Sequence, residues 1–361
     1  GQRCSALRCL YIQEDIAPNL IKMIKGAMDE LSLGNPWHLS TDVGPVIDET
    51  ARRQIAEYIA TAKADGRLLH ALSAPAMGTF IAPALIQVHG IDALKREVFG
   101  PILHVATFKT SQINNVIDDI NATGYGLTFG LHTRIDSRVQ AISDSIKAGN
   151  IYVNRNQIGA IVGSQPFGGE GLSGTGPKAG GPRYMLRMCK AKQQTSGEAW
   201  TTVANVAAVR SQINEAAKTM SHAPLKSHIM AGPTGETNTL TASARPPVLC
   251  LGPGQNALTQ QINAVEAHGG VAVAVTGTLQ PGALVALNGF SGVLYWGKNA
   301  AAYGKALAKR GGAILPLVTT LPDEAHVLLE RHLCVDTTAA GGNAALLSGD
   351  EPIYEGDIST I

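Results

Sequence analysis

The first residue with the chemistry of a catalyst lies near the start of the sequence, where the segment GQRCSALR places Cys4 between Arg3 and Ser5. A thiolate is a strong nucleophile once nearby cations or a helix N-terminus lower its pKa. Arg3 is adjacent in the sequence, although adjacent side chains often point apart. From these residues alone, Cys4 is either an activated nucleophile or an inert buried thiol. The inert description fits the remaining cysteines better: Cys9, Cys189, Cys250 and Cys334.

The composition restricts the classes of partner. Of the 361 residues, 16% are charged and 45% hydrophobic, and the net charge is +1. This composition is typical of an α/β protein, and it gives no electrostatic reason to expect nucleic acid or an anionic membrane surface as the main partner. The five cysteines include no CxxC pair, which favours free thiols in a reducing compartment. No metal cluster is expected from the scattered histidines, and no apolar run is long enough to span a membrane.

Strand-like and helix-like segments alternate through the first part of the chain. Strands are expected at 5–13, 79–88, 102–110, 127–133 and 150–154. Helices are expected at 14–31, 49–66, 111–126 and 134–149, and a loop at 33–48. This alternation predicts an α/β domain with a parallel sheet.

The pattern changes at residues 159–182, where glycine is so frequent that only a loop can form. Residues 184–195 read as an exposed or swapped strand, 196–222 as a helix and 230–240 as a linker. A second α/β unit begins near Pro246, with further strands at 271–275, 292–296 and 313–318. The GPG of LCLGPGQNAL follows a strand and opens a helix, but it lacks the full GxGxxG pattern. We therefore expect a tight turn in a non-catalytic domain rather than a dinucleotide site.

Five segments in order resemble the aldehyde dehydrogenase superfamily. GQRCSALR resembles its active-site cysteine signature, EVFGP at 97–101 its cofactor-ribose motif, and GYGLTFGL, GNIYVN and PFGGEGLSGTG follow in the family's order. SGTGPKAGGP is similar to the anchor loop of L-glutamate γ-semialdehyde (Δ1-pyrroline-5-carboxylate) dehydrogenases. GPTGETNTL and DTTAAGGNAALL look like segments of the bifunctional proline utilization family, so the resemblance covers nearly the whole chain.

The resemblance implies an architecture. An α/β aldehyde dehydrogenase catalytic domain at 1–184, truncated at its amino terminus, would precede an oligomerisation strand, helix and linker at 185–240. A second α/β domain at 241–332 would resemble the family's cofactor fold, and 333–361 would form a lid segment.

The resemblance also implies a reaction and its residues. Cys4 would be the nucleophile in NAD-dependent oxidation of L-glutamate γ-semialdehyde to L-glutamate. Glu97 would accept hydrogen bonds from the cofactor ribose, and Phe99 would pack near the nicotinamide. On chemistry alone, Glu97 is better explained as a solvated charge.

The substrate-binding residues implied by the resemblance each have an ordinary alternative. Ser5 would donate to the substrate α-carboxylate, or it is a plain loop serine. Gly180 and Gly181 would offer backbone N–H groups to the same carboxylate, or they form a simple turn. Phe167 would wall the aliphatic part of the substrate, or it is an ordinary core residue.

The family also implies parts that this sequence does not contain: an upstream cofactor domain and, further upstream, a proline dehydrogenase domain with FAD. We expect a cytoplasmic homo-oligomer, whose longer polypeptide allows peripheral association with a membrane. Two other readings remain. The chain is a non-catalytic assembly and lid module in which 185–196 oligomerise and 333–348 cover an active site, or it is a thiol hydrolase, which would need a histidine partner for Cys4.

Overall fold

The computed structural model describes residues 1–174, 176–221 and 223–337. The chain divides into two compact units, each described by itself below. The first contains 1–124 and 157–159, and the second contains 125–156 and the chain from Ala160 onward.

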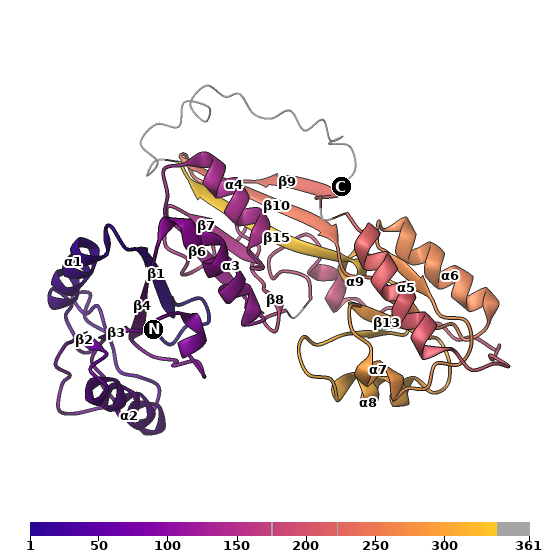
Figure 1. Cartoon of the computed structure of the whole chain (residues 1–361), viewed down its shortest axis with the longest axis horizontal. Helices are drawn as coiled ribbons and strands as arrows, with labels where there is room; N and C mark the ends of the chain where they lie inside the picture. The colour runs from indigo at the N-terminus through magenta and orange to yellow at the C-terminus, as the bar shows by residue number, and fades with distance from the viewer. Residues whose placement is uncertain (175, 222, 338–361) are drawn as a thin grey trace. The chain divides into compact units, whose positions relative to one another are not determined.

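The first unit is built on a four-stranded sheet in the order β1-β4-β3-β2 (Figure 1). Its strands are β1 (Cys9–Gln13), β2 (Leu68–Ala71), β3 (Ala84–Gln87) and β4 (Ile102–Phe108). Its helices are α1 (Ala17–Asp29), α2 (Glu49–Ala64) and α3 (Ile113–Ala122), with short 3₁₀ turns η1 (Ile91–Ala93) and η2 (Thr110–Gln112). The pairs β1–β4 and β4–β3 are parallel, as the alternating pattern predicted, whereas β2 runs antiparallel to β3 and was not predicted.

Alternating side chains of this sheet bury its two faces under different helices. Leu85 packs in a cluster with residues of α1, and its neighbour Ile86 packs with residues of α2. Helix α2 begins where the side chain of Asp48 accepts a hydrogen bond of 2.7 Å from the Ala51 N–H, which satisfies a free amide of the first turn. The chain leaves the helix at Gly66, whose φ of 72° suits glycine.

The second unit contains a mixed five-stranded sheet that joins distant parts of the sequence, in the order β6-β7-β15-β10-β9 (Figure 1). The strands are β6 (Thr128–Leu131), β7 (Asn150–Val153), β9 (Lys226–Met230), β10 (Glu236–Ala244) and β15 (Leu328–Asp336). Helix α4 (Asp136–Ser145) connects β6 to β7, and the two-residue strands β5 (Tyr125–Gly126) and β8 (Glu170–Gly171) form a separate pair. The pair β7–β15 is parallel, and β10 lies antiparallel to both β15 and β9.

The second unit also contains a parallel four-stranded sheet in the order β12-β11-β13-β14, which confirms the second α/β region predicted from the sequence. Its strands are β11 (Val248–Cys250), β12 (Ala272–Ala274), β13 (Gly292–Leu294) and β14 (Leu317–Val318). Its helices are α5 (Val206–Thr219), α6 (Gln255–Ala267), α7 (Ala283–Ala286), α8 (Ala300–Ala308) and α9 (Glu324–Val327). Leu249 packs with residues of α5, α7 and α8, whereas Val248 and Cys250 pack with residues of α6 on the other face.

The strand expected at 184–195 is wrong. The segment forms a 3₁₀ turn, η3 (Met185–Met188), in which the Arg187 N–H donates to the Tyr184 carbonyl oxygen over 3.1 Å. These local hydrogen bonds use backbone N–H groups that, in a strand, would donate to a neighbouring strand. Further on, the segment makes an isolated antiparallel bridge between Gln193 and Thr320. A role of 185–196 in oligomerisation stays a prediction.

The linker expected at 230–240 is also wrong, because β9 and β10 form an antiparallel hairpin there. The Gly and Pro residues between 231 and 235 make its turn. Two boundaries predicted from the sequence fall inside strands: 240/241 lies within β10, and 332/333 lies within β15. Of the segment predicted as a lid, residues 333–336 complete β15, and 338–361 lie outside the described residues.

Candidate active site

Cys4 lies in a tight turn just before β1. The Ala6 N–H donates to the Arg3 carbonyl oxygen over 3.2 Å, which places Cys4 and Ser5 at the corner of this turn. Cys4 is exposed, whereas Ser5 is buried, and the Ser5 carbonyl oxygen accepts a hydrogen bond of 3.3 Å from the Gln157 side chain. A buried corner beside an exposed thiol presents the sulfur to a reactant while fixing the backbone that carries it.

The other cysteines differ from Cys4 in their surroundings. Burial raises the pKa of the Cys9 and Cys250 thiols to about 12 and that of Cys334 to about 11, so all three stay protonated and unreactive at neutral pH. Cys189 is exposed and its thiol donates to the Met185 carbonyl oxygen over 3.7 Å. Exposure therefore distinguishes Cys4 from the half-buried Cys9 and the buried Cys250 and Cys334, and the exposed Cys189 serves as a control.

Arg8 connects the Cys4 turn to the EVFGP segment. Its guanidinium donates 2.8 Å hydrogen bonds to the carbonyl oxygens of Gly1 and Arg3 and to Oε1 of Glu97. The guanidinium carbon also lies 4.6 Å from the centre of the Phe99 ring, within the range of a cation–π contact. One side chain thus contacts the turn that carries Cys4 and both residues expected to bind cofactor.

The sheet explains why these segments meet. Because β1 and β4 are parallel neighbours, the segments that precede them emerge at the same edge of the sheet. Gly1 lies so close to Gly100 that a Cβ at Gly1 would overlap the Gly100 carbonyl oxygen. The backbone of Arg8 is fixed as well, because its carbonyl oxygen lies 2.7 Å from Nδ1 of the buried His104 on β4.

A cavity of about 250 Å³ adjoins this edge. Glu97 and Phe99 contribute to its wall, together with Gln2, Ala51, Gln54, Ile55, Arg96 and Val98. The Glu97 side chain is 56% exposed, and Phe99 is 41% exposed. A carboxylate acceptor, an aromatic face and amide groups around one cavity fit a ribose and a flat ring, which are parts of a nicotinamide cofactor.

The remaining sequence-predicted residues belong to the second unit, in the glycine-rich loop. Phe167 and Ala179 exchange two backbone hydrogen bonds of 3.0 and 2.9 Å, so the loop folds back on itself. Gly180 has a φ of 72°, a conformation that favours glycine. The Gly181 N–H donates to the Lys178 carbonyl oxygen over 3.0 Å and closes the turn, so it is not a bare donor in this structure.

Two buried residues fix this loop to the sheet, and sequence reasoning missed both. The Lys178 ammonium donates to the carbonyl oxygens of Gly149 (2.7 Å) and Gly168 and to Oδ1 of Asn150 (3.0 Å). Asn150, on β7, also donates to the Pro166 carbonyl oxygen over 2.9 Å. The available signal was a single lysine inside a glycine-rich loop, which is an unusual place for a long charged side chain.

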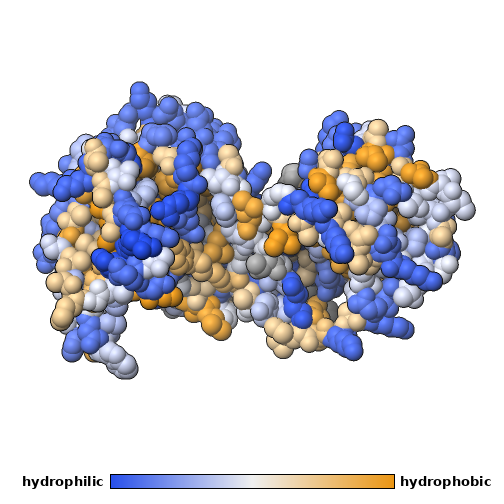
Figure 2. Space-filling view, turned by 90° about the horizontal axis from the view of Figure 1, so that it is seen from below, coloured by the Kyte–Doolittle hydropathy of each residue, from blue (hydrophilic) through white to orange (hydrophobic). Residues whose placement is uncertain are grey.

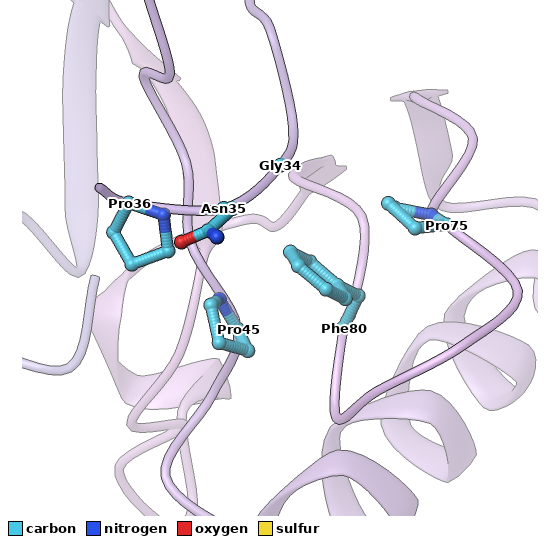
Figure 3. A pocket seen from close by; sticks show the side chains of 6 residues that line it. All are labelled: Gly34, Asn35, Pro36, Pro45, Pro75 and Phe80. Atoms are coloured by element: carbon cyan, nitrogen blue, oxygen red, sulfur yellow. The ribbon is translucent and has the colours of Figure 1, made fainter. Parts of the chain in front are cut away.

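A second cavity, of about 370 Å³, lies elsewhere in the first unit (Figure 3). The Phe80 ring faces Asn35 and Pro45 across it, and Gly34, Pro36 and Pro75 complete its lining. These side chains include no nucleophile, acid or base, so this cavity offers no catalytic group. Apolar and hydrophilic residues are interspersed on the face shown in Figure 2, so exposed apolar side chains by themselves do not select a binding site.

The GPG segment forms the tight turn that its spacing predicted. Gly252 and Gly254 have φ values of 77° and 83°, and α6 begins directly afterwards. The Asn256 N–H at the start of α6 lies 3.3 Å from Oε2 of Glu198, so a carboxylate of the chain itself occupies this helix end. Among the described residues, no helix is long and apolar enough to cross a membrane.

Comparisons with known proteins agree with these motifs. Residues 1–194 match the model of the aldehyde dehydrogenase family. The bifunctional protein PutA of Salmonella typhimurium is 38% identical over 96% of this chain, and the alignment covers 31% of that protein. The chain therefore spans about a third of the length of such relatives. A 1-pyrroline-5-carboxylate dehydrogenase of Bacillus cereus is 37% identical over 53% of the chain and 38% of its own length.

A solved structure supports the fold over about half of the chain. A crystal structure of Bradyrhizobium japonicum proline utilization A matches with a TM-score of 0.51 and 52% sequence identity, covering 52% of this chain and 19% of that one. Together with the family match over residues 1–194, these relatives show that the chain belongs to the aldehyde dehydrogenase family.

Proposed function

We propose that this chain carries the nucleophile of an NAD-dependent L-glutamate γ-semialdehyde dehydrogenase of proline catabolism. The observation that carries the proposal is the Arg8 guanidinium, which holds the Cys4 turn against Glu97 and Phe99. The substrate class rests on the similarity to PutA and 1-pyrroline-5-carboxylate dehydrogenases.

In this proposal the Cys4 thiolate attacks the aldehyde carbon and forms a thiohemiacetal, while the Cys4 backbone N–H stabilises the developing oxyanion. Glu97 and Phe99 would hold NAD⁺, which would supply the acceptor for the hydride that leaves this carbon. The resulting thioester on Cys4 is hydrolysed by water, which yields L-glutamate and restores the thiol. Covalent capture thus divides one difficult oxidation into two easier steps.

Substrate selection would involve the residues that the similarity implies. The Ser5 hydroxyl and the backbone amides of Gly180 and Gly181 would bind the α-carboxylate, and Phe167 would contact the aliphatic part. Because the Gly181 N–H is engaged by Lys178 in this structure, its use would require that the substrate share or replace this bond.

We also propose the wider setting that the similarity implies. The chain would act as part of a cytoplasmic homo-oligomer, in one polypeptide with a cofactor domain and an FAD-containing proline dehydrogenase domain. The sheet that joins β7 to β10 and β15 favours a second, structural role, in which the carboxy-terminal region stabilises the catalytic fold.

The proposal is tested by NADH formation from L-glutamate γ-semialdehyde in the 361-residue chain and in the full-length gene product that contains it. We expect turnover in the full-length protein, and its loss in Cys4→Ala. Cys189→Ala is the matched control, because it removes the other exposed thiol. Equal turnover in the wild type and in Cys4→Ala would refute the assignment of the nucleophile.

A further inference from the structure

The turn that carries Gly180 and Gly181 is held on both sides by a single carboxylate. Oε2 of Glu330 accepts a hydrogen bond of 2.9 Å from the Lys178 backbone N–H, before the two glycines. Oε1 of the same group accepts a hydrogen bond of 2.7 Å from Nη1 of Arg183, after them. Glu330 therefore bridges the two ends of the turn.

This carboxylate comes from a distant part of the sequence. Glu330 lies on β15, where it is directly opposite Ala242 of β10. Glu330 is 6% exposed and Arg183 is 5% exposed, so the ion pair is almost fully removed from water. Arg183 also pairs with Glu324 on α9 over 2.8 Å, so both contacts of the arginine come from the carboxy-terminal region.

Backbone bonds close the turn at Gly181 and pair Ala179 with Phe167, and the Glu330 carboxylate adds the side-chain contacts at its two ends. Two consecutive glycines have more backbone freedom than any other pair of residues, and ordering them upon binding would weaken the affinity for a ligand. A turn that is already fixed avoids this loss. Because Lys178 is also anchored through its ammonium, Glu330 and Arg183 complete a closed frame around the glycines.

We propose that Glu330 is a positioning residue for the substrate α-carboxylate: it fixes the turn whose glycine amides bind that group. This inference rests on the proposed function, since it requires a carboxylate substrate at Gly180 and Gly181. It adds that β15, from the carboxy-terminal region, sets the affinity for that substrate.

The substitution Glu330→Gln separates positioning from simple electrostatics by the sign of its effect. Removing a negative charge beside an anion site would, by charge alone, strengthen binding of the substrate carboxylate. Positioning predicts the reverse. The amide of glutamine can accept from only one of the two donors, and its NH₂ group would face the other.

The experiment compares two aldehydes in the full-length protein. We expect Glu330→Gln to raise KM for L-glutamate γ-semialdehyde about tenfold, which corresponds to about 1.4 kcal/mol. Butanal lacks the α-carboxylate, so its KM should change by less than about twofold in the same variant. In Glu330→Asp the charge is kept, but the aspartate side chain is too short to bridge both donors. This variant should therefore raise KM for the semialdehyde and leave KM for butanal unchanged.

Glu236→Gln is the matched control. Glu236 is a half-buried carboxylate of the same sheet, on β10; it pairs with Arg155 and accepts a hydrogen bond of 2.9 Å from the Gln165 side chain, and it makes no bond to Lys178 or Arg183. It should leave the ratio of the two KM values unchanged. Hydrogen exchange of the Lys178 amide should become faster in Glu330→Gln and not in Glu236→Gln, which tests the contact even if activity is weak.

The outcomes distinguish the two proposals. An unchanged or lower KM for the semialdehyde in Glu330→Gln, or equal changes for both aldehydes, would overturn the positioning role while leaving the proposed function intact. A wild-type protein that oxidises butanal but not the semialdehyde would refute the substrate assignment, and the positioning role with it. Unchanged exchange at Lys178 in Glu330→Gln would show that Glu330 does not hold the turn.

Discussion

Replacing Arg8 by methionine should loosen the turn that carries Cys4, and the structure gives the size of the effect. Methionine keeps most of the aliphatic length but removes every donor. The substitution deletes two hydrogen bonds to loop carbonyl oxygens, one ion pair with Glu97 and the cation–π contact with Phe99. The question is which of these interactions contributes more.

The ion pair contributes less than the loop hydrogen bonds. The Arg8 side chain is 15% exposed, but that of Glu97 is 56% exposed, so water screens the pair. A pair of this kind contributes about 0.5 kcal/mol. The two carbonyl oxygens of Gly1 and Arg3 accept charge-assisted bonds, which contribute about 1 kcal/mol each after allowance for their partial exposure. The cation–π contact with the partly exposed Phe99 adds about 0.5 kcal/mol, so the total for Arg8→Met is about 3 kcal/mol, mostly from the loop.

A local measurement is required, because the chain has two units and the unfolding of the second unit does not report on the turn that carries Cys4. Hydrogen exchange at the amides of β1 reports the opening of the adjacent loop and strand. We expect Arg8→Met to lower the opening free energy there by about 2–3 kcal/mol, and Glu97→Gln by less than about 1 kcal/mol. In the full-length protein, Arg8→Met should also lower kcat for NADH formation.

The double variant Arg8→Met/Glu97→Gln completes a thermodynamic cycle. The coupling free energy between the two positions should be about 0.5 kcal/mol. A coupling above about 2 kcal/mol would refute the reasoning, since it would mean that the ion pair, and not the loop contacts, fixes the position of Cys4.

Three further predictions concern stability. Burial lowers the pKa of His332 from 6.5 to about 4, so between these values the unfolded chain binds a proton that the folded chain does not. Stability should therefore fall by up to about 3 kcal/mol as the pH decreases through this window, and His332→Gln should remove this part of the acid sensitivity in urea unfolding at pH 7 and 4.5. Gly149→Ala should lower the free energy of unfolding by about 3 kcal/mol, because its Cβ would overlap the Gly168 carbonyl oxygen. A Tm equal to that of the wild type would contradict this. Leu249→Ala, at a fully buried position of β11, should cost about 2–5 kcal/mol in the same unfolding assay, whereas a loss below about 1 kcal/mol would mean that the core relaxes around the cavity.

Sequence patterns predicted those elements whose signals are local. Helix α2 has its N-cap at Asp48 and its stop at Gly66, and both are visible as residue types. The strands β1 and β4 are short apolar runs separated by helical segments, which suffices to predict a parallel pair. The proximity of Cys4 to Glu97 follows from this pairing, since both residues precede neighbouring parallel strands.

Other elements depend on partners that no local pattern reveals. Strand β10 carries the polar sequence ETNTLTASA, and it becomes half-buried only because β9 and β15 pair with its two edges. The Gly and Pro residues before it resemble a linker as much as a hairpin turn. Likewise, the lone lysine in the glycine-rich loop is visible in the sequence, but its partners Gly149 and Asn150 are not.

In one hypothesis the carboxy-terminal region is an assembly and lid module, and in the other it is part of the catalytic fold. The pairing of its strands bears on both. Strand β15 pairs with β7 on one side and with β10 on the other, so the carboxy-terminal region completes the sheet that contains β6 and β7. The same strand carries Glu330, whose carboxylate accepts hydrogen bonds from Lys178 and Arg183 at the two ends of the glycine turn. A deletion from residue 333 would remove the end of β15 and disturb this sheet, and its effect on turnover could not be attributed to a lost lid. A deletion from residue 338 leaves β15 complete, and it is therefore the variant that separates a covering role from a positioning role.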